Sequence, residues 1–189
     1  ISEYEVGDLH VREAQMPAHD DTNVVLIEVL GWNIRLSDAG YGAVTSFVVI
    51  VPDTEVEGAF YTQLFGLDEL MHHRIVGPAI EKAVGLPRGS ALIMRLMGRE
   101  TELFGRMELV QYEGLTGTDR FPLAQSPALG TLHCRVEVDS MDKFIERARS
   151  LGVAVRHYGP IQTMFGSGLA AAVYSPAGLR LEVIEPDVK

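Results

Sequence analysis

The sequence predicts an α+β fold in which the order strand, helix, three strands occurs twice. Apolar side chains make up 47% of the 189 residues, enough for a real core, and charged side chains make up 22%. The apolar runs have strand length, and a few segments with helical spacing lie between them. The same residue types also recur in the same order: residues 46–51, 64–67 and 107–110 align with residues 133–138, 150–153 and 181–184.

The first copy of this pattern is expected over residues 44–114. Residues 44–51 are rich in β-branched and aromatic side chains and end at Pro52-Asp53, which predicts a strand closed by a turn. Asp53 or Thr54 can cap the helix that follows, and Gly66 ends it. Further strands are expected at residues 68–75, 91–97 and 106–112, with a short helix at residues 78–84.

The second copy is expected over residues 131–189, after a linker of residues 115–130 that contains glycine and proline. Its glycines at 159, 166 and 168 indicate a mobile loop between strands. The expected elements are a strand at residues 131–138, a helix at residues 141–150, and strands at residues 153–157, 170–174 and 179–184.

Residues 1–43 fit neither copy in full. Residues 9–14 and 23–29 are typical of a strand pair, and residues 17–22 are typical of its turn. This pair is either the end of a third, upstream copy or an extension that adds edge strands. The chain does not begin with methionine, so we expect that Ile1 is not its natural start.

Composition excludes several classes of partner. A formal charge of −10, from 26 acidic and 16 basic residues, repels phosphate backbones and anionic lipid. We therefore expect a small-molecule ligand, and neither nucleic acid nor a membrane as partner. The single cysteine, Cys134, provides neither an internal disulfide nor a multi-cysteine metal site. We expect a cytoplasmic protein.

The strand order and several short motifs resemble the vicinal oxygen chelate superfamily, which includes glyoxalase I, bleomycin-resistance proteins and extradiol dioxygenases. The motifs are Val51-Pro52-Asp53, Phe60-Tyr61, Leu64-Phe65-Gly66-Leu67 and the segment 175–182. The resemblance implies paired βαβββ modules whose curved mixed sheets form one glyoxalase-like cup, with the helices on its convex side. It also implies that a homodimer is possible, because relatives often complete their cups by dimerising.

In the family, a metal at the floor of the cup is held by the first and last strand of each module. Carried over by position, those places are Ser46, Glu108, His133 and Glu182. Strand alternation agrees for the second copy: His133 lies opposite the apolar Leu132 and Cys134 side, and Glu182 lies opposite Leu181 and Val183. The helix should cover the apolar side, so these ligand-type residues should face the cup.

Serine is a weak ligand for a transition metal, so Ser46 departs from the family pattern. We therefore expect Glu108, His133 and Glu182 to hold a divalent ion, either Mn²⁺, Fe²⁺, Ni²⁺, Mg²⁺ or Zn²⁺. Glu108 or Glu182 could also act as the catalytic base. Candidate substrate-binding residues are Ser46, Tyr112, Arg135 and Arg180.

Structural roles for these residues remain open alternatives. His133 could be hydrogen-bonded to one of the glutamates. The glutamates could instead pair with arginines, namely Arg95, Arg135 or Arg180.

The leading functional hypothesis is a metal-dependent isomerase, epimerase or lyase that acts on a small oxygenated molecule. The alternative is a metal-free protein that binds a drug-like or aromatic ligand. An extradiol dioxygenase is a third hypothesis, which we do not favour because the first-module histidine is missing. The sequence leaves open whether the chain is an enzyme, and we favour an enzyme.

Overall fold

The computed structural model describes every residue except 103, 165, 188 and 189. The chain forms two compact units, each of which is described by itself. Unit 1 contains Ile1–Thr62 and Leu67–Thr118, and unit 2 contains Gln63–Gly66 and Asp119–Lys189. None of the helices in the described residues combines the length and apolar character that crossing a bilayer requires.

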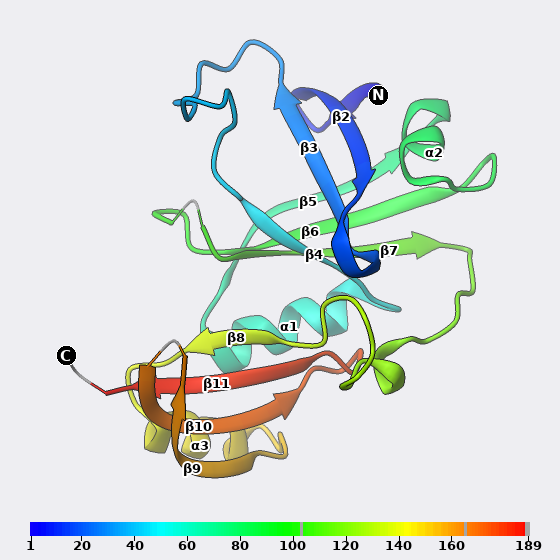
Figure 1. Cartoon of the computed structure of the whole chain (residues 1–189). Helices are drawn as coiled ribbons and strands as arrows, with labels where there is room; N and C mark the ends of the chain where they lie inside the picture. The colour runs from blue at the N-terminus through cyan, green and yellow to red at the C-terminus, as the bar shows by residue number, and fades with distance from the viewer. Residues whose placement is uncertain (103, 165, 188–189) are drawn as a thin grey trace. The chain divides into compact units, whose positions relative to one another are not determined.

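The first βαβββ module, apart from the end of its first helix, lies in unit 1 and has the expected order of elements (Figure 1). Its strands lie side by side in the order β4-β7-β6-β5, with β4 parallel to β7 and the other neighbours antiparallel. The elements are β4 (Ser46–Ile50), α1 (Thr54–Phe65), β5 (Asp68–Val76), α2 (Pro78–Val84), β6 (Ala91–Gly98) and β7 (Arg106–Glu113).

Helix α1 begins and packs as the sequence predicts. The Asp53 carboxylate accepts hydrogen bonds from the backbone N–H groups of Glu55 (2.8 Å) and Val56 (3.1 Å), so Asp53 caps the helix. Gly58 lies against the side chains of Met97 and Leu109, within 4 Å of where its Cβ would be. Helix α1 therefore covers the sheet face that carries Leu109. The opposite face, which carries Glu108, is called the cup face of the module.

The N-terminal region forms its own sheet of β1 (Ser2–Val6), β2 (Leu9–Pro17) and β3 (Asn23–Val29). The expected pair corresponds to β2 and β3, whereas β1 was not expected. Strands β1, β2 and β3 pair with one another, and all the pairings are antiparallel.

This N-terminal sheet packs on the cup face of the first module. Val6 and Val11 belong to one buried cluster with Leu92, Met94 and Val110, among other residues. Met94 pairs with Val110 across β6 and β7, and Val110 shares its face with Glu108. Part of the core of unit 1 therefore lies between the cup face and the N-terminal sheet, and the cup face of this module is covered.

The second βαβββ module lies in unit 2, with the strand order β8-β11-β10-β9. Strand β8 is parallel to β11, and the other neighbours are antiparallel. The elements are β8 (Cys134–Glu137), α3 (Met141–Ser150), β9 (Arg156–Thr163), β10 (Gly166–Tyr174) and β11 (Arg180–Pro186), and a short 3-10 helix, η2 (Phe121–Leu123), precedes them.

The glycine-rich segment of this module is a strand pair, so the expected loop is wrong. Gly159 lies within β9, and Gly166 and Gly168 lie within β10. A register shift occurs between Ala170 and Ala171 where β10 pairs with β9. The absence of large alternating side chains hid this pairing from the sequence pattern.

Helix α3 packs on the apolar side of the second sheet. The Ser140 hydroxyl accepts a hydrogen bond from the backbone N–H of Lys143, which caps the helix. Phe144 is buried in α3, and Leu181 and Val183 are fully buried in β11. These two residues alternate with Arg180, Glu182 and Ile184, which therefore form the cup face of the second module.

Candidate functional site

The two modules place their candidate site residues in the same strand register. Val48 of β4 pairs with Glu108 of β7, and Arg135 of β8 pairs with Glu182 of β11. Ser46 and His133 each lie two residues before the strand partner of the glutamate. Ser46 with Glu108, and His133 with Glu182, are therefore equivalent pairs on the cup faces of their modules.

In unit 2, the structure brings His133 and Glu182 together. The distance between His133 Nε2 and Glu182 Oε2 is 3.9 Å. The two side chains are 39% and 24% exposed, so solvent or a ligand can reach them. His133 directly precedes the first residue of β8, which begins at Cys134 rather than at residue 131 as expected. The predicted proximity of this imidazole and this carboxylate follows from the parallel pairing of β8 and β11.

In unit 1, the structure brings Ser46 and Glu108 together. The Ser46 hydroxyl donates a hydrogen bond of 3.2 Å to Glu108 Oε2. Burial raises the pKa of the Glu108 carboxyl above its ordinary value, the Ser46 hydrogen bond acts in the opposite direction, and the neighbouring Glu13 carboxylate raises the pKa further. Glu108 thus holds a proton more readily than an exposed glutamate does.

Glu13 is a site residue that the sequence analysis missed. It is 6% exposed, and its carboxylate accepts hydrogen bonds from the Tyr4 hydroxyl and from Gln15 Nε2, the latter at 2.9 Å. Burial and the two neighbouring glutamates raise the pKa of the Tyr4 phenol. The alternation of β2 carried a signal, because Glu13 shares a face with the buried Val11.

The structure bears on the arginine pairs that were an open alternative. Arg95 pairs with Glu69, and Arg135 approaches Glu137 at 4.0 Å. Across the described residues, neither Glu108 nor Glu182 forms an ion pair with an arginine. In the described part of the chain, neither carboxylate is therefore neutralised by an arginine within ion-pair distance.

The other candidate residues have distinct surroundings. Tyr112 lies in unit 1, where burial and then the Glu13 charge raise the pKa of its phenol. Arg135 pairs in register with Glu182, and Arg180 lines a pocket of unit 2. Cys134 pairs in register with Leu181, on the helix side of the sheet, and burial raises its thiol pKa to about 11. A thiol with such a pKa is a poor nucleophile at neutral pH.

Within either unit, the described residues include no group of three or more His, Cys, Asp or Glu side chains that could hold a metal ion. The predicted ligands divide between the units, with Glu108 in unit 1 and His133 and Glu182 in unit 2. Their donor atoms, one imidazole nitrogen and carboxylate oxygens, suit a divalent ion of the first transition series or Mg²⁺. The chemistry of the residues therefore fits a divalent metal.

Comparison with known structures identifies the fold. A glyoxalase family protein from Bacillus cereus matches with a TM-score of 0.65 at 17% identity, over 80% of this chain and 99% of that chain. Glyoxalase I from Leishmania major matches with a TM-score of 0.50 at 18% identity, over 77% and 87% of the two chains. A glyoxylase/bleomycin resistance protein/dioxygenase domain from Frankia matches with a TM-score of 0.50 at 21% identity, over 77% and 98%.

No protein-family model and no curated protein matches the sequence. The structural matches confirm the expected resemblance at the level of the fold, which is glyoxalase-like. Because this fold carries many unrelated reactions, the function has to be argued from the residues of the site.

Proposed function

We propose, from the glyoxalase-like fold and the two equivalent residue pairs, that the chain is a metal-dependent isomerase, epimerase or lyase. Its substrate would be a small oxygenated organic molecule. The observation that carries this proposal is the shared register of the two modules. It puts Glu108 and Glu182 at equivalent places and brings His133 within 3.9 Å of Glu182.

Glu108, His133 and Glu182 would hold the divalent ion, whose identity we leave among Mn²⁺, Fe²⁺, Ni²⁺, Mg²⁺ and Zn²⁺. When bound, such an ion polarises a carbonyl group or a pair of neighbouring oxygens. Glu182 would orient the His133 ring. Glu108 or Glu182 would be the group that takes up and returns a proton at the substrate.

A second candidate is a metal-free protein that binds a small ligand. It is favoured by one observation, the hydrogen bond of 3.2 Å between Ser46 and Glu108. A serine in this place gives the first module a weaker metal ligand than an imidazole would. In such a protein, Glu108 and Ser46 would be polar residues of the interior without a catalytic role.

Metal analysis of the chain purified without chelator separates the two candidates. We expect a stoichiometric divalent ion in the wild type and its loss in His133→Ala, because a ligand would be removed. His157→Ala is the matched control, since His157 is an exposed histidine of β9 in the same sheet, and it should keep the ion. If the wild type takes up none of the five ions after loading, the metal-dependent proposal is wrong and the binding protein remains.

Two further features belong to this proposal. The protein would act in the cytoplasm on a free small molecule, with neither nucleic acid nor membrane as a partner, as its charge of −10 favours. It would also be able to form a homodimer, which light scattering of the purified chain would detect as a doubled mass.

A further inference from the structure

Unit 2 contains a pocket with a volume of about 360 Å³. It lies between η2 and the strands of the second module, and Arg180, Tyr174 and Arg156 contribute to its lining. Tyr174 pairs in register with Arg180, which places both on the cup face that also carries Glu182. This volume lies near the lower end of the range of about 300–1,000 Å³ for small-molecule sites.

The charged groups that line the pocket are two arginines. The lining contains Arg156 and Arg180 and no aspartate or glutamate, although the chain as a whole is strongly acidic. In the described part of the chain, Arg180 forms no ion pair, and its Nε is buried without a hydrogen-bond partner. A partly buried guanidinium without a partner is costly, and an anion that occupies the pocket would offset this cost.

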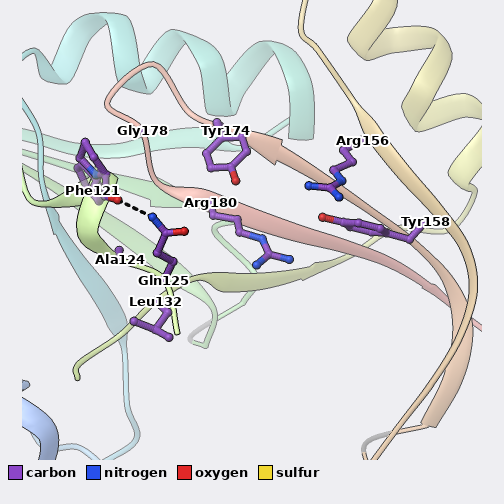
Figure 2. Close-up of a pocket in the computed structure, with 10 residues that line it drawn as sticks. Phe121, Ala124, Gln125, Leu132, Arg156, Tyr158, Tyr174, Gly178 and Arg180 are labelled. Atoms are coloured by element: carbon purple, nitrogen blue, oxygen red, sulfur yellow. Dashed lines mark hydrogen bonds between the residues drawn. The ribbon is translucent and has the colours of Figure 1, made fainter. Parts of the chain in front are cut away.

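The geometry around Arg180 suits a flat ligand. Figure 2 shows its guanidinium between Gln125 on one side and Arg156 and Tyr158 on the other. The Arg156 guanidinium lies 5.3 Å from the centre of the Tyr158 ring, a cation–π distance that holds both side chains in place. Gln125 is held by a hydrogen bond of 2.9 Å from its Nε2 to the Pro122 carbonyl.

Aromatic and apolar side chains supply the remaining walls. Phe121 packs directly on the turn before β11, because a Cβ on Gly178 would lie 3.1 Å from the Phe121 Cβ. Tyr174 and Leu132 also belong to the lining (Figure 2). Aromatic rings stack favourably on the flat faces of other rings.

We propose that this pocket binds an aromatic oxyanion, with a carboxylate or phosphate group on Arg180 and the ring against the tyrosines. The planar guanidinium fork binds both groups through two parallel hydrogen bonds. The pocket and the His133–Glu182 pair share one sheet face, so the ligand would lie beside that pair. That this ligand is the substrate rests on the proposed function, whereas the binding itself does not.

The test is a titration followed by NMR of the ¹⁵N-labelled full chain, in buffer with EDTA so that no metal contributes. Benzoate and phenyl phosphate are the charged probes, and benzamide is the neutral analogue of benzoate. We expect benzoate or phenyl phosphate to shift signals of residues 121–125, 156–158 and 174–180. Benzamide should bind on the order of tenfold more weakly, because it lacks the charge. The anion that binds more tightly shows whether the pocket prefers a carboxylate or a phosphate group.

Arg180→Gln should weaken binding of that anion by on the order of tenfold. Arg149→Gln removes the same charge from an exposed arginine of α3 and should leave the affinity unchanged. If Arg180→Gln does not fold, as judged from its ¹⁵N spectrum, Arg180→Lys keeps the charge without the fork and should still weaken binding. Equal affinity for benzamide and benzoate, no effect at Arg180, or no shift with either anion would overturn the assignment.

The outcome is independent of the metal proposal. A chain that binds benzoate in EDTA but takes up no metal would retain this pocket and lose the proposed reaction. A chain that takes up metal at His133 but binds neither anion would retain the proposed metal site and lose the proposed anion pocket.

Discussion

The two modules share one backbone plan but differ in what their cup faces meet. In the first module, the cup face is covered by the N-terminal sheet, and Val110 and Met94 pack there against Val11. In the described part of unit 2, no second sheet covers the cup face, which carries Arg180 and Glu182. Two modules with the same strand register can therefore have cup faces that differ in what covers them.

The largest expected effect comes from a charge placed under the N-terminal sheet. Val11→Asp buries an unpaired carboxylate and should lower the free energy of unfolding of unit 1 by about 3–5 kcal/mol. Tyr174→Asp puts the same charge on the exposed cup face of the second module and should cost less than about 0.5 kcal/mol. Denaturant unfolding of both variants measures the two values. Similar losses would contradict the contrast between a covered and an open face.

The helix-facing sides of the two sheets should respond alike. Met107 and Leu181 occupy equivalent places in β7 and β11, and both are buried. Met107→Ala and Leu181→Ala should each cost about 2–5 kcal/mol, because each leaves a cavity. Calorimetry of the two variants provides the comparison. If only one variant is destabilised, the two sheets also differ on the faces that meet the helices. The N-terminal sheet over the first cup face would then not be the main difference between the modules.

The smallest effect concerns the covered carboxyl of the first module. Because the pKa of Glu108 is raised, the folded chain binds its proton more tightly than the unfolded chain does. The resulting stability is complete below the unfolded pKa of about 4.3, and it is lost as the pH rises through the higher folded pKa. Glu108→Gln should remove this loss and should therefore be more stable than the wild type at pH 7.

Ser46→Ala provides the opposite change. It removes the hydrogen bond that lowers the pKa of Glu108, so the loss of stability should extend to higher pH than in the wild type. Thermal melts of both variants between pH 4 and pH 8 measure these effects. A Glu108→Gln variant that gains no stability over the wild type as the pH rises, or a Ser46→Ala variant with an unchanged profile, would contradict this account of Glu108.

The sequence was informative where side-chain alternation was regular. Alternation in β11 predicted the face of Glu182, and the turn at Pro52-Asp53 predicted the start of α1. It was uninformative in β9 and β10, where Gly159, Gly166 and Gly168 suggested a loop although strand pairing organises the backbone.

The candidate site was predictable only in part. The pairs Ser46–Glu108 and His133–Glu182 are close because the first and last strands of each module pair in the same register. The short motifs in the sequence were enough to place these strands. Glu13 reaches the surroundings of Glu108 from a separate sheet, and a pattern within one strand does not encode such packing between sheets. The pocket around Arg180 depends in the same way on η2, whose position no periodicity predicts.

The proline of β9 has a consequence for the behaviour of the molecule in concentrated solution. Strand β9 lies at the edge of its sheet, and such an edge offers unpaired backbone groups to which another chain can add a strand. Pro160 removes one donor from that edge, and the nearby shift in pairing bends it. This edge is therefore less suited to pairing with a strand of another chain than a regular edge strand without proline would be.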